Sequence, residues 1–465
     1  MGDSHGKRSS ALLNVLKGFK HCDLVVSRNP LLAGHILVWS VYLFSCLVTP
    51  AKSLYEDTHA RGVFLIVSYV VLSVAGALLL MAVFPKRAIR QEPAEKMSRL
   101  YDYLKPHRLI LLTSLLVLCG LLLHLYDKVF IMKIDYSAGI AKARHQWLAH
   151  GTERGGGISS WQSAAGHILV NFHFIVMAMV LVFWKELPKA YKYLGYVVSV
   201  TAILIYSGSI GSRSVPLFFL LYVISIMLLS KSLGRGFLPK GFRFLFVLLV
   251  FLFFAYNLFV FHERGKVFGS SPKQYTESFY SHLGGKEDEQ CTWGENLPGF
   301  LSEIYYYTIL TTIYINHNQW TFDYVLTLKD RPGQSLMNTL YGGLVKVGLL
   351  PKERVGNRAF SGVFLSLPGC AYYDYGVWGM IIIAILHGTF IFAANRMVRG
   401  HHLRVGFIFF YLLVGVFSLV SPLTSAANLM IFPYMVISYV CLPFFVILVK
   451  LPVLKRDGSL GDDAV

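Results

Sequence analysis

Ten apolar runs constrain what this chain can fold into more than any other feature of its sequence. They cover residues 30–50, 62–84, 109–126, 163–184, 194–211, 215–230, 243–262, 375–395, 405–424 and 428–449. A helix rises about 1.5 Å per residue, so roughly 20 apolar residues cross a hydrocarbon core about 30 Å thick. Inside a bilayer the backbone must satisfy its own hydrogen bonds, and a helix does so within one segment. The runs therefore predict an all-α, polytopic integral membrane protein with about ten transmembrane helices.

The composition agrees with this class of protein. Hydrophobic residues make up 55% of the chain and charged residues 15%, with a mean hydropathy of +0.54, which is typical of a membrane protein. In a soluble protein, the net charge of +18 would point to a nucleic-acid partner. Here most of the basic residues lie in the segments outside the apolar runs. We therefore assign the charge to membrane topology and expect no nucleic-acid partner.

The basic residues lie in alternate inter-span segments, which predicts the orientation of the chain. Seven, three, four and three Lys and Arg residues lie in the segments 85–108, 185–193, 231–243 and 396–404. The first 29 residues hold five more, and the chain from Lys450 onward holds three, so 25 of the 43 fall on one side. Because short basic loops mark the cytoplasmic side, both termini are expected in the cytoplasm.

This topology divides the chain into a cytoplasmic arm (1–29), a membrane domain (30–450) and a cytoplasmic tail (451–465). No small-residue cleavage site follows a short apolar segment near the start, so we expect an uncleaved arm. The connection at 263–374 is unusually long and falls on the non-cytoplasmic side. Its apolar segment 298–316 would break the charge alternation if it were one extra span. We therefore expect interfacial or re-entrant helices in this loop, packed on protein or lining a cavity.

The stretch from Ser207 to Pro216 (SGSIGSRSVP) joins two of the apolar runs and places Arg213 where a membrane helix begins. Proline suits the first turn of a helix, and the hydroxyls of Ser212 and Ser214 could cap its free amides. A helix N-terminus beside an arginine attracts anions, often a phosphate. The alternative is an arginine that anchors the helix at the membrane–water interface.

Further candidate binding residues lie in the large loop and at its start. His262, Arg264 and Lys266 follow the seventh run, and Lys352, Arg354 and Arg358 lie in PKERVGNR. Paired arginines bind a pyrophosphate well, although a helix C-terminus or a solvated loop also favours such cations. Tyr306 and His317 belong to an aromatic and polar stretch that suits sugar rings and hydroxyls; an interfacial aromatic belt is the alternative.

The sequence gives little sign of other chemistry. It lacks a nucleotide-binding G-x-x-x-x-G-K-[ST] motif, zinc-ligand spacing and a G-x-S-x-G elbow, so we expect no metal and no cofactor. The spans carry almost no charge, which argues against an ion-coupled transporter. We interpret His387, deep in the eighth run, as a packing residue. Cys291 and Cys370 share the outer loop, and spacing leaves open whether they form a disulfide.

Four stretches together resemble the Wzy family of bacterial oligosaccharide repeat-unit polymerases, which includes the enterobacterial common antigen polymerase. They are IGSRSVPLFFLL, NLFVFHERGKVFG, YGGLVKVGLLPKERVGNRAFSG and PGCAYYDYGVWGMIIIAILHG. The resemblance covers the spacing of residues 195–450. The turn SPLTSAANLM lacks the Arg or Glu that some members carry, so no substrate-binding role follows for it from the resemblance.

The resemblance implies a glycosyltransferase that polymerises repeat units on undecaprenyl pyrophosphate at the periplasmic face of the bacterial inner membrane, in O-antigen or exopolysaccharide synthesis. A chain-length regulator and a flippase are possible partners besides the bilayer. Arg213 and Arg264 would stabilise the pyrophosphate leaving group. The base that activates the sugar hydroxyl stays open among His262, Glu263, Glu303 and Asp374. A lipid-linked glycan ligase and a polysaccharide or lipid transporter remain alternatives.

The charge count generates a topology prediction. Reporter fusions after residues 90, 237, 400 and 460 should report the cytoplasm, and fusions after residues 150 and 285 should report the outer side. The measurement is paired alkaline-phosphatase and fluorescent-protein fusions in a bacterial host. A cytoplasmic signal after residue 285 would refute the arrangement.

Overall fold

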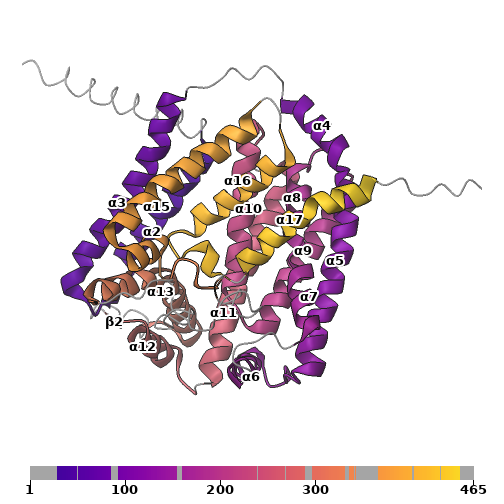
Figure 1. The fold of residues 1–465 in the computed structure, drawn as a ribbon. Helices are drawn as coiled ribbons and strands as arrows, with labels where there is room; N and C mark the ends of the chain where they lie inside the picture. The colour runs from indigo at the N-terminus through magenta and orange to yellow at the C-terminus, as the bar shows by residue number, and fades with distance from the viewer. Residues whose placement is uncertain are drawn as a thin grey trace, which may run out of the picture.

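The computed structural model describes residues 29–49, 51–84, 93–153, 160–237, 239–267, 269–287, 296–329, 335–339, 341, 365–400, 403–429 and 431–450. Helices account for most of these residues. Figure 1 shows them as one bundle, with α8 and α10 near its centre, α3 and α15 on one side, and α5 on the other.

All ten apolar runs form helices, so the prediction of an all-α, multi-pass membrane protein is confirmed. Within the described residues, nine helical segments are long and apolar enough to cross a membrane. They are α2 (Pro30–Val48), α3 (Glu56–Val83), α5 (Pro106–Tyr126) with the π-helical turn η1 (Asp127–Ile131), α7 (Trp161–Val170) with α8 (His173–Val182), α9 (Lys189–Ile210), α10 (Ser214–Ser232), α11 (Arg243–Val267), α15 (Leu367–Arg399) and α17 (Ile431–Lys450). The tenth, α16 (Val405–Val420), has 16 residues.

Both ends of the described chain lie at the same end of the bundle, which we call the basic end (Figure 1). Asn29, before α2, contacts Met81 near the end of α3, and Arg396 of α15 donates to the Phe84 carbonyl. Lys450, at the end of α17, lies over the ring of Tyr103 in α4 (Pro93–Leu104). An even number of crossings follows, as the charge alternation requires. The side of the membrane that the basic end faces remains a prediction.

Two of the expected spans are interrupted helices. The run 163–184 was expected as one span, but a turn at Asn171 and Phe172 divides it into α7 and α8. All ten residues of α8 are buried. In α15, Gly376 has φ 69° and ψ −162°, a conformation that glycine adopts readily because it has no Cβ. The kink separates the first nine residues of α15 from the rest of the helix.

The loop end, opposite the basic end, carries the helices α6 (Ile140–Glu153), α12 (Pro272–His282) and α13 (Gly299–Thr327). A strand after α2, β1 (Ala51–Ser53), pairs antiparallel with a strand of the large loop, β2 (Gly285–Glu287). The segment 298–316 was expected as an interfacial or re-entrant helix, and α13 is longer than this, with 29 residues. It is not among the nine spanning segments, and it packs against α2, α3 and α12.

The closest helix contact joins α3 and α15 through small residues. A Cβ on Gly388 would overlap the backbone carbonyl oxygen of Ser73 and lie 3.0 Å from the amide nitrogen of Ala77. Lipid supplies little hydrophobic force between membrane helices, so close backbone approach at small residues is a main source of their association. This contact joins the first spans of the chain to the spans that follow the large loop.

The contact predicts that Gly388→Ala destabilises the protein although alanine favours helices. Overpacking costs roughly 1–3 kcal/mol, whereas the helix-propensity gain is about 1 kcal/mol at most. Thermal unfolding in detergent micelles should show a lower midpoint. The control is Gly406→Ala in α16, where a new Cβ meets no atom within 4 Å of the position. An unchanged midpoint for Gly388→Ala would contradict the close packing.

Candidate functional site

The site begins at the end of α9, where Gly211 adopts the left-handed conformation with φ 58°. The Ser212 amide then bonds back to the Ser207 carbonyl over 2.9 Å, which ends the helix. Gly211 suits this turn because a side chain there would be strained. As a result, the carbonyls of Ile210 and Gly211 lie at the helix terminus and accept hydrogen bonds from other elements.

Two arginines donate to these carbonyls. Arg264 of α11 donates to the Gly211 oxygen over 2.8 Å. Arg144 of α6 donates to the Ile210 oxygen over 2.8 Å and to the Gly211 oxygen over 3.2 Å. The negative end of the α9 dipole favours both cations. The sequence predicted Arg264 for this site but missed Arg144, which lies in a separate loop.

Arg213, the residue before α10, is the third arginine of the group, and it is only 5% exposed. Its Cζ atom lies 3.9 Å from the ring centroid of Phe261 and 4.2 Å from that of Tyr314. One terminal nitrogen, NH1, is buried and has no hydrogen-bond partner. Burial lowers the pKa of the Arg213 guanidinium, and the neighbouring charge of Arg264 lowers it further. Among the described residues, this positive charge thus has aromatic rings beside it but no acidic partner.

The three arginines, which we call the arginine cluster, have no acidic partner among the described residues. The nearby carboxylates pair elsewhere. Glu263 accepts from Lys266 over 3.2 Å, and Glu303 pairs with His262 Nδ1 over 3.0 Å. Burying a charge without an acidic partner costs free energy. A group of arginines buried in this way therefore favours the binding of an anion, which would supply the missing negative charge.

The expectation that Ser212 and Ser214 cap α10 is wrong. Their hydroxyls lie 3.0 Å apart and bond to each other, and no side chain caps this helix. Pro216 is the third residue of α10 and contributes no amide hydrogen. The positive end of the α10 dipole therefore adds to the charge of the arginine cluster and is available to an anion.

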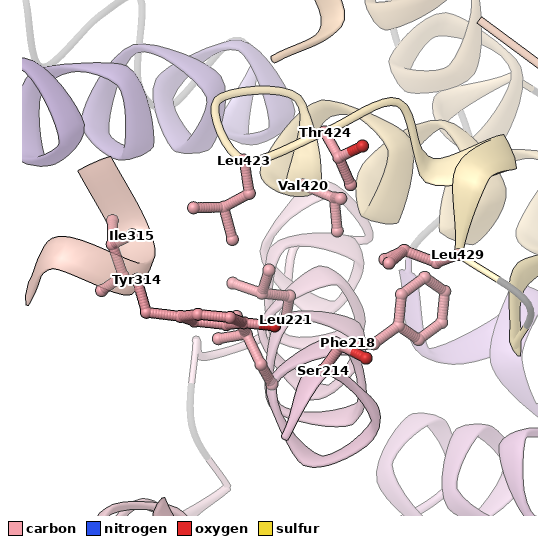
Figure 2. A pocket seen from close by; sticks show the side chains of 10 residues that line it. Ser214, Phe218, Leu221, Tyr314, Ile315, Val420, Leu423, Thr424 and Leu429 are labelled. Carbon is pink, nitrogen blue, oxygen red and sulfur yellow. The ribbon is translucent and has the colours of Figure 1, made fainter. Parts of the chain in front are cut away.

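Figure 2 shows an apolar slot lined in part by Tyr314, whose ring also lies beside Arg213. It is small, with a cavity volume of about 20 Å³, and lies between α10, α13 and the segment 420–429. Its walls include Leu217, Phe218 and Leu221 of α10 together with Leu423 and Leu429. Ser214 and Tyr314 also line it. Because Ser214 directly follows Arg213 in the chain, the slot lies next to the arginine cluster.

The structure divides the expected catalytic residues between two sides of α11. Arg264 points to the α9 turn, whereas His262 pairs with Glu303 of α13. Two residues along an α-helix differ by about 200° around its axis, so the two side chains point in nearly opposite directions. Glu263 lies toward the start of α6, because a Cβ on Gly139 would be 3.1 Å from its carboxylate. His262 and Glu303 form a pair of their own.

His317 lies closer to the arginine cluster than the sequence indicated. It is one turn after Tyr314 on α13, is 1% exposed, and its Nδ1 bonds to the Tyr314 carbonyl over 2.8 Å. A carbonyl only accepts, so the proton is on Nδ1 and the lone pair on Nε2. Burial lowers the pKa of His317 to about 4, and the positive charge of Arg213 contributes to the decrease.

Asp374 holds part of the large loop in place through hydrogen bonds to its backbone. Its carboxylate accepts from the backbone amides of Ser335 and Leu336 over 2.6 and 2.8 Å. Tyr306, expected to bind sugar, is buried in α13 beside Tyr305. Cys370 carries a free, buried thiol. Four other candidates, Cys291, Lys352, Arg354 and Arg358, lie outside the described residues.

The amides beside His317, expected to meet sugar hydroxyls, instead join helices. Asn318 accepts from Tyr42 of α2 over 2.5 Å and donates to the carbonyls of Pro422 and Leu423. Asn316 donates to Thr49 over 2.5 Å. These contacts hold α13 against α2 and against the turn after α16. The polar stretch therefore positions α13, the helix that carries Tyr314 and His317.

A scan of protein-family models, a search of curated proteins and a search of solved structures each found no match. No family is therefore assigned, and the resemblance to the Wzy polymerases remains an expectation.

The uncompensated charge predicts that Arg213→Met stabilises the ligand-free protein. The methionine side chain follows the path of the apolar part of the arginine side chain. The substitution removes the cost of burying a charge. It also removes cation–π contacts worth about 0.5–2 kcal/mol. We expect the thermal midpoint in detergent to rise by a few degrees, whereas Arg99→Met, at an exposed pair with Glu95, should change little. A lower midpoint for Arg213→Met would show that the charge is structural.

Proposed function

We propose that this protein is a membrane glycosyltransferase that polymerises oligosaccharide repeat units carried on a polyprenyl pyrophosphate. The observation that carries the proposal is the arginine cluster, in which Arg144, Arg213 and Arg264 gather around one helix end without an acidic partner in the described residues. The proposal places the loop end on the periplasmic side of a bacterial inner membrane.

A pyrophosphate suits the arginine cluster in charge and in shape. Each guanidinium presents several N–H donors in a plane and binds phosphate oxygens in pairs. The two phosphate groups of the substrate carry two negative charges, and a third develops on the leaving pyrophosphate as the glycosyl bond breaks. Arg213 is buried, so its interaction with an anion is screened less by water than that of a surface arginine. Donors fixed in place before reaction are what stabilise charge as it develops on a leaving group.

In the proposed reaction, the hydroxyl oxygen of the acceptor sugar attacks the anomeric carbon of the donor. The carbon–oxygen bond to the pyrophosphate breaks, and its electron pair leaves with the pyrophosphate, where the arginine cluster stabilises it. The hydroxyl proton must pass to a base. The glycosyl–pyrophosphate bond supplies the driving force, which agrees with the absence of a nucleotide-binding motif from the sequence.

Among the candidate bases, we assign proton transfer to His317, because it lies within electrostatic reach of Arg213. A bound pyrophosphate would offset the charge of Arg213, which is the smaller of the two causes that lower the pKa of His317; burial is the larger. His262 and Glu303, on the other side of α11, remain available to contact sugar.

The test compares Arg213→Lys and Arg213→Ala with wild-type protein on a synthetic polyprenyl-pyrophosphate repeat unit. Arg213→Ala should abolish the ladder of products on a gel, because a lost phosphate contact in a buried site costs several kcal/mol. Arg213→Lys should restore little, since one ammonium cannot reproduce the paired contacts of a guanidinium.

The control is Arg108→Lys at the basic end, which should keep full activity. Protein level and membrane insertion are measured for every variant. Wild-type activity in Arg213→Lys would support an interfacial anchor, because lysine reaches the interface as well as arginine does. Transfer of one glycan to another lipid without a ladder would indicate a ligase, and movement of intact substrate would indicate a transporter.

A further inference from the structure

The first turn of α3 holds the second half of α13 through contacts that the proposed reaction does not use. The Thr58 hydroxyl donates to the Asp323 carbonyl over 2.8 Å. His59 Nδ1 donates to Asp323 Oδ2 over 2.7 Å, because an ionised carboxylate only accepts. The same helix carries Tyr314 and His317, so these contacts help to position both side chains.

Asp323 is a buried carboxylate with one cationic partner in the part of the chain that the structure describes. Its side chain is 0% exposed, whereas that of His59 is 45% exposed. Its Oδ1 atom accepts from the Gln319 side-chain amide over 2.8 Å, but an amide carries no charge. A buried carboxylate without a positive charge beside it costs free energy. The compensation of Asp323 therefore depends on whether His59 is protonated.

The Asp323 carboxylate packs directly against the α3 backbone at Gly62. This glycine lies one turn after His59, and a Cβ there would overlap Asp323 Oδ1 and lie 2.8 Å from the Gln319 amide nitrogen. The close approach of α3 to α13 therefore requires glycine at this position, and it leaves no space for a second cation at Oδ1.

The other charged groups close to this pair are of types that keep their charge around neutral pH. On α3, Glu56 pairs with Lys286 of β2, and Lys52 of β1 also acts on Glu56. Carboxylates, lysines and arginines are ordinarily charged between about pH 6 and 8, and tyrosine and cysteine are mostly neutral there. The remaining groups of these types are Asp57 and Arg61 on α3, Tyr324 on α13, Tyr42 and Cys46 on α2, and Tyr373 on α15.

Histidine is the residue type that changes charge in this range. The histidines on the helices packed against the pair interact either about three turns further along α3 or with Arg213, and they are His35 of α2, His387 of α15 and His317 of α13. His59 is therefore the described group through which a change of pH near neutrality acts on this contact.

We propose that His59 and Asp323 form a pH-sensitive latch that holds α13 against α3. When His59 carries its second proton, the imidazolium balances the buried carboxylate and their hydrogen bond is charge-assisted. When the pH rises and this proton is lost, Asp323 stays buried without a cation and the contact weakens. Attachment of α13 is thus firmer at pH 6 than at pH 8, in a range where a carboxylate remains ionised. The latch requires no particular substrate, so it stands apart from the proposed function.

Hydrogen–deuterium exchange of the full-length protein in detergent micelles tests the latch. Peptides that cover residues 317–327 are followed at pH 6, 7 and 8, and each rate is compared with the intrinsic rate at that pH to give a protection factor. In wild-type protein the protection factor should fall roughly fivefold or more from pH 6 to pH 8, because a charge-assisted hydrogen bond is stronger than a neutral one.

Two variants separate the charge from the contact. Asp323→Asn removes the buried charge, so protection should become nearly independent of pH. His59→Lys keeps a cation beside Asp323 throughout this range, so protection at pH 8 should stay near its value at pH 6. The matched control is Glu56→Gln, which removes an exposed pair with Lys286 in the same turn of α3 and should keep the wild-type dependence on pH.

Equal protection of the wild-type protein at pH 6 and pH 8 would overturn the latch, and this measurement does not depend on a variant folding. A dependence on pH that persists in Asp323→Asn, or that disappears in Glu56→Gln, would place the responsible group elsewhere and would overturn it too. If Asp323→Asn does not fold, His59→Lys decides, since a loss of protection at pH 8 as large as in wild type contradicts the latch.

Discussion

The end of α9 is the feature on which the site depends. Like charges repel strongly in a medium of low dielectric constant, so three arginines gather only where something offsets them. The carbonyls of Ile210 and Gly211, at the negative end of the α9 dipole, accept from Arg144 and Arg264. Arg213 has no such acceptor among the described residues and lies at the positive end of α10. The end of α9 thus binds two of the three cations, and the third lies at the start of the next helix.

Much of the fold could be predicted from the sequence, because the backbone of a membrane span must form its own hydrogen bonds and long apolar runs are the result. All ten runs are helical. Consecutive spans run in opposite directions, so Arg213 at the start of α10 and Arg264 near the end of α11 both lie at the loop end. Arg144 could not be found in this way. It lies in α6, a short polar helix whose position depends on tertiary contacts with α9 and α11.

Two patterns show that residue type alone does not predict which partner a polar side chain will bond to. Ser212 and Ser214 have the hydroxyls of helix caps, but they bond to each other. Asn316 and Asn318 have amides that suit sugar hydroxyls, but they bond to Thr49, Tyr42 and the carbonyls after α16. An amide that joins buried helices and an amide that binds a sugar present the same donors and acceptors. Only the three-dimensional arrangement tells them apart.

The pairing of β1 with β2 has a consequence for how this protein can diverge. The two strands bring the connection after α2 next to the large loop, with Lys52 opposite Lys286 in the register. Such a pairing is made by main-chain hydrogen bonds, which every residue except proline can form. Anchorage of the loop therefore places few demands on its side chains, although Gly285 is an exception, because a Cβ there would overlap the Trp320 ring. The rest of the large loop can change in sequence while this pairing keeps it beside the connection after α2.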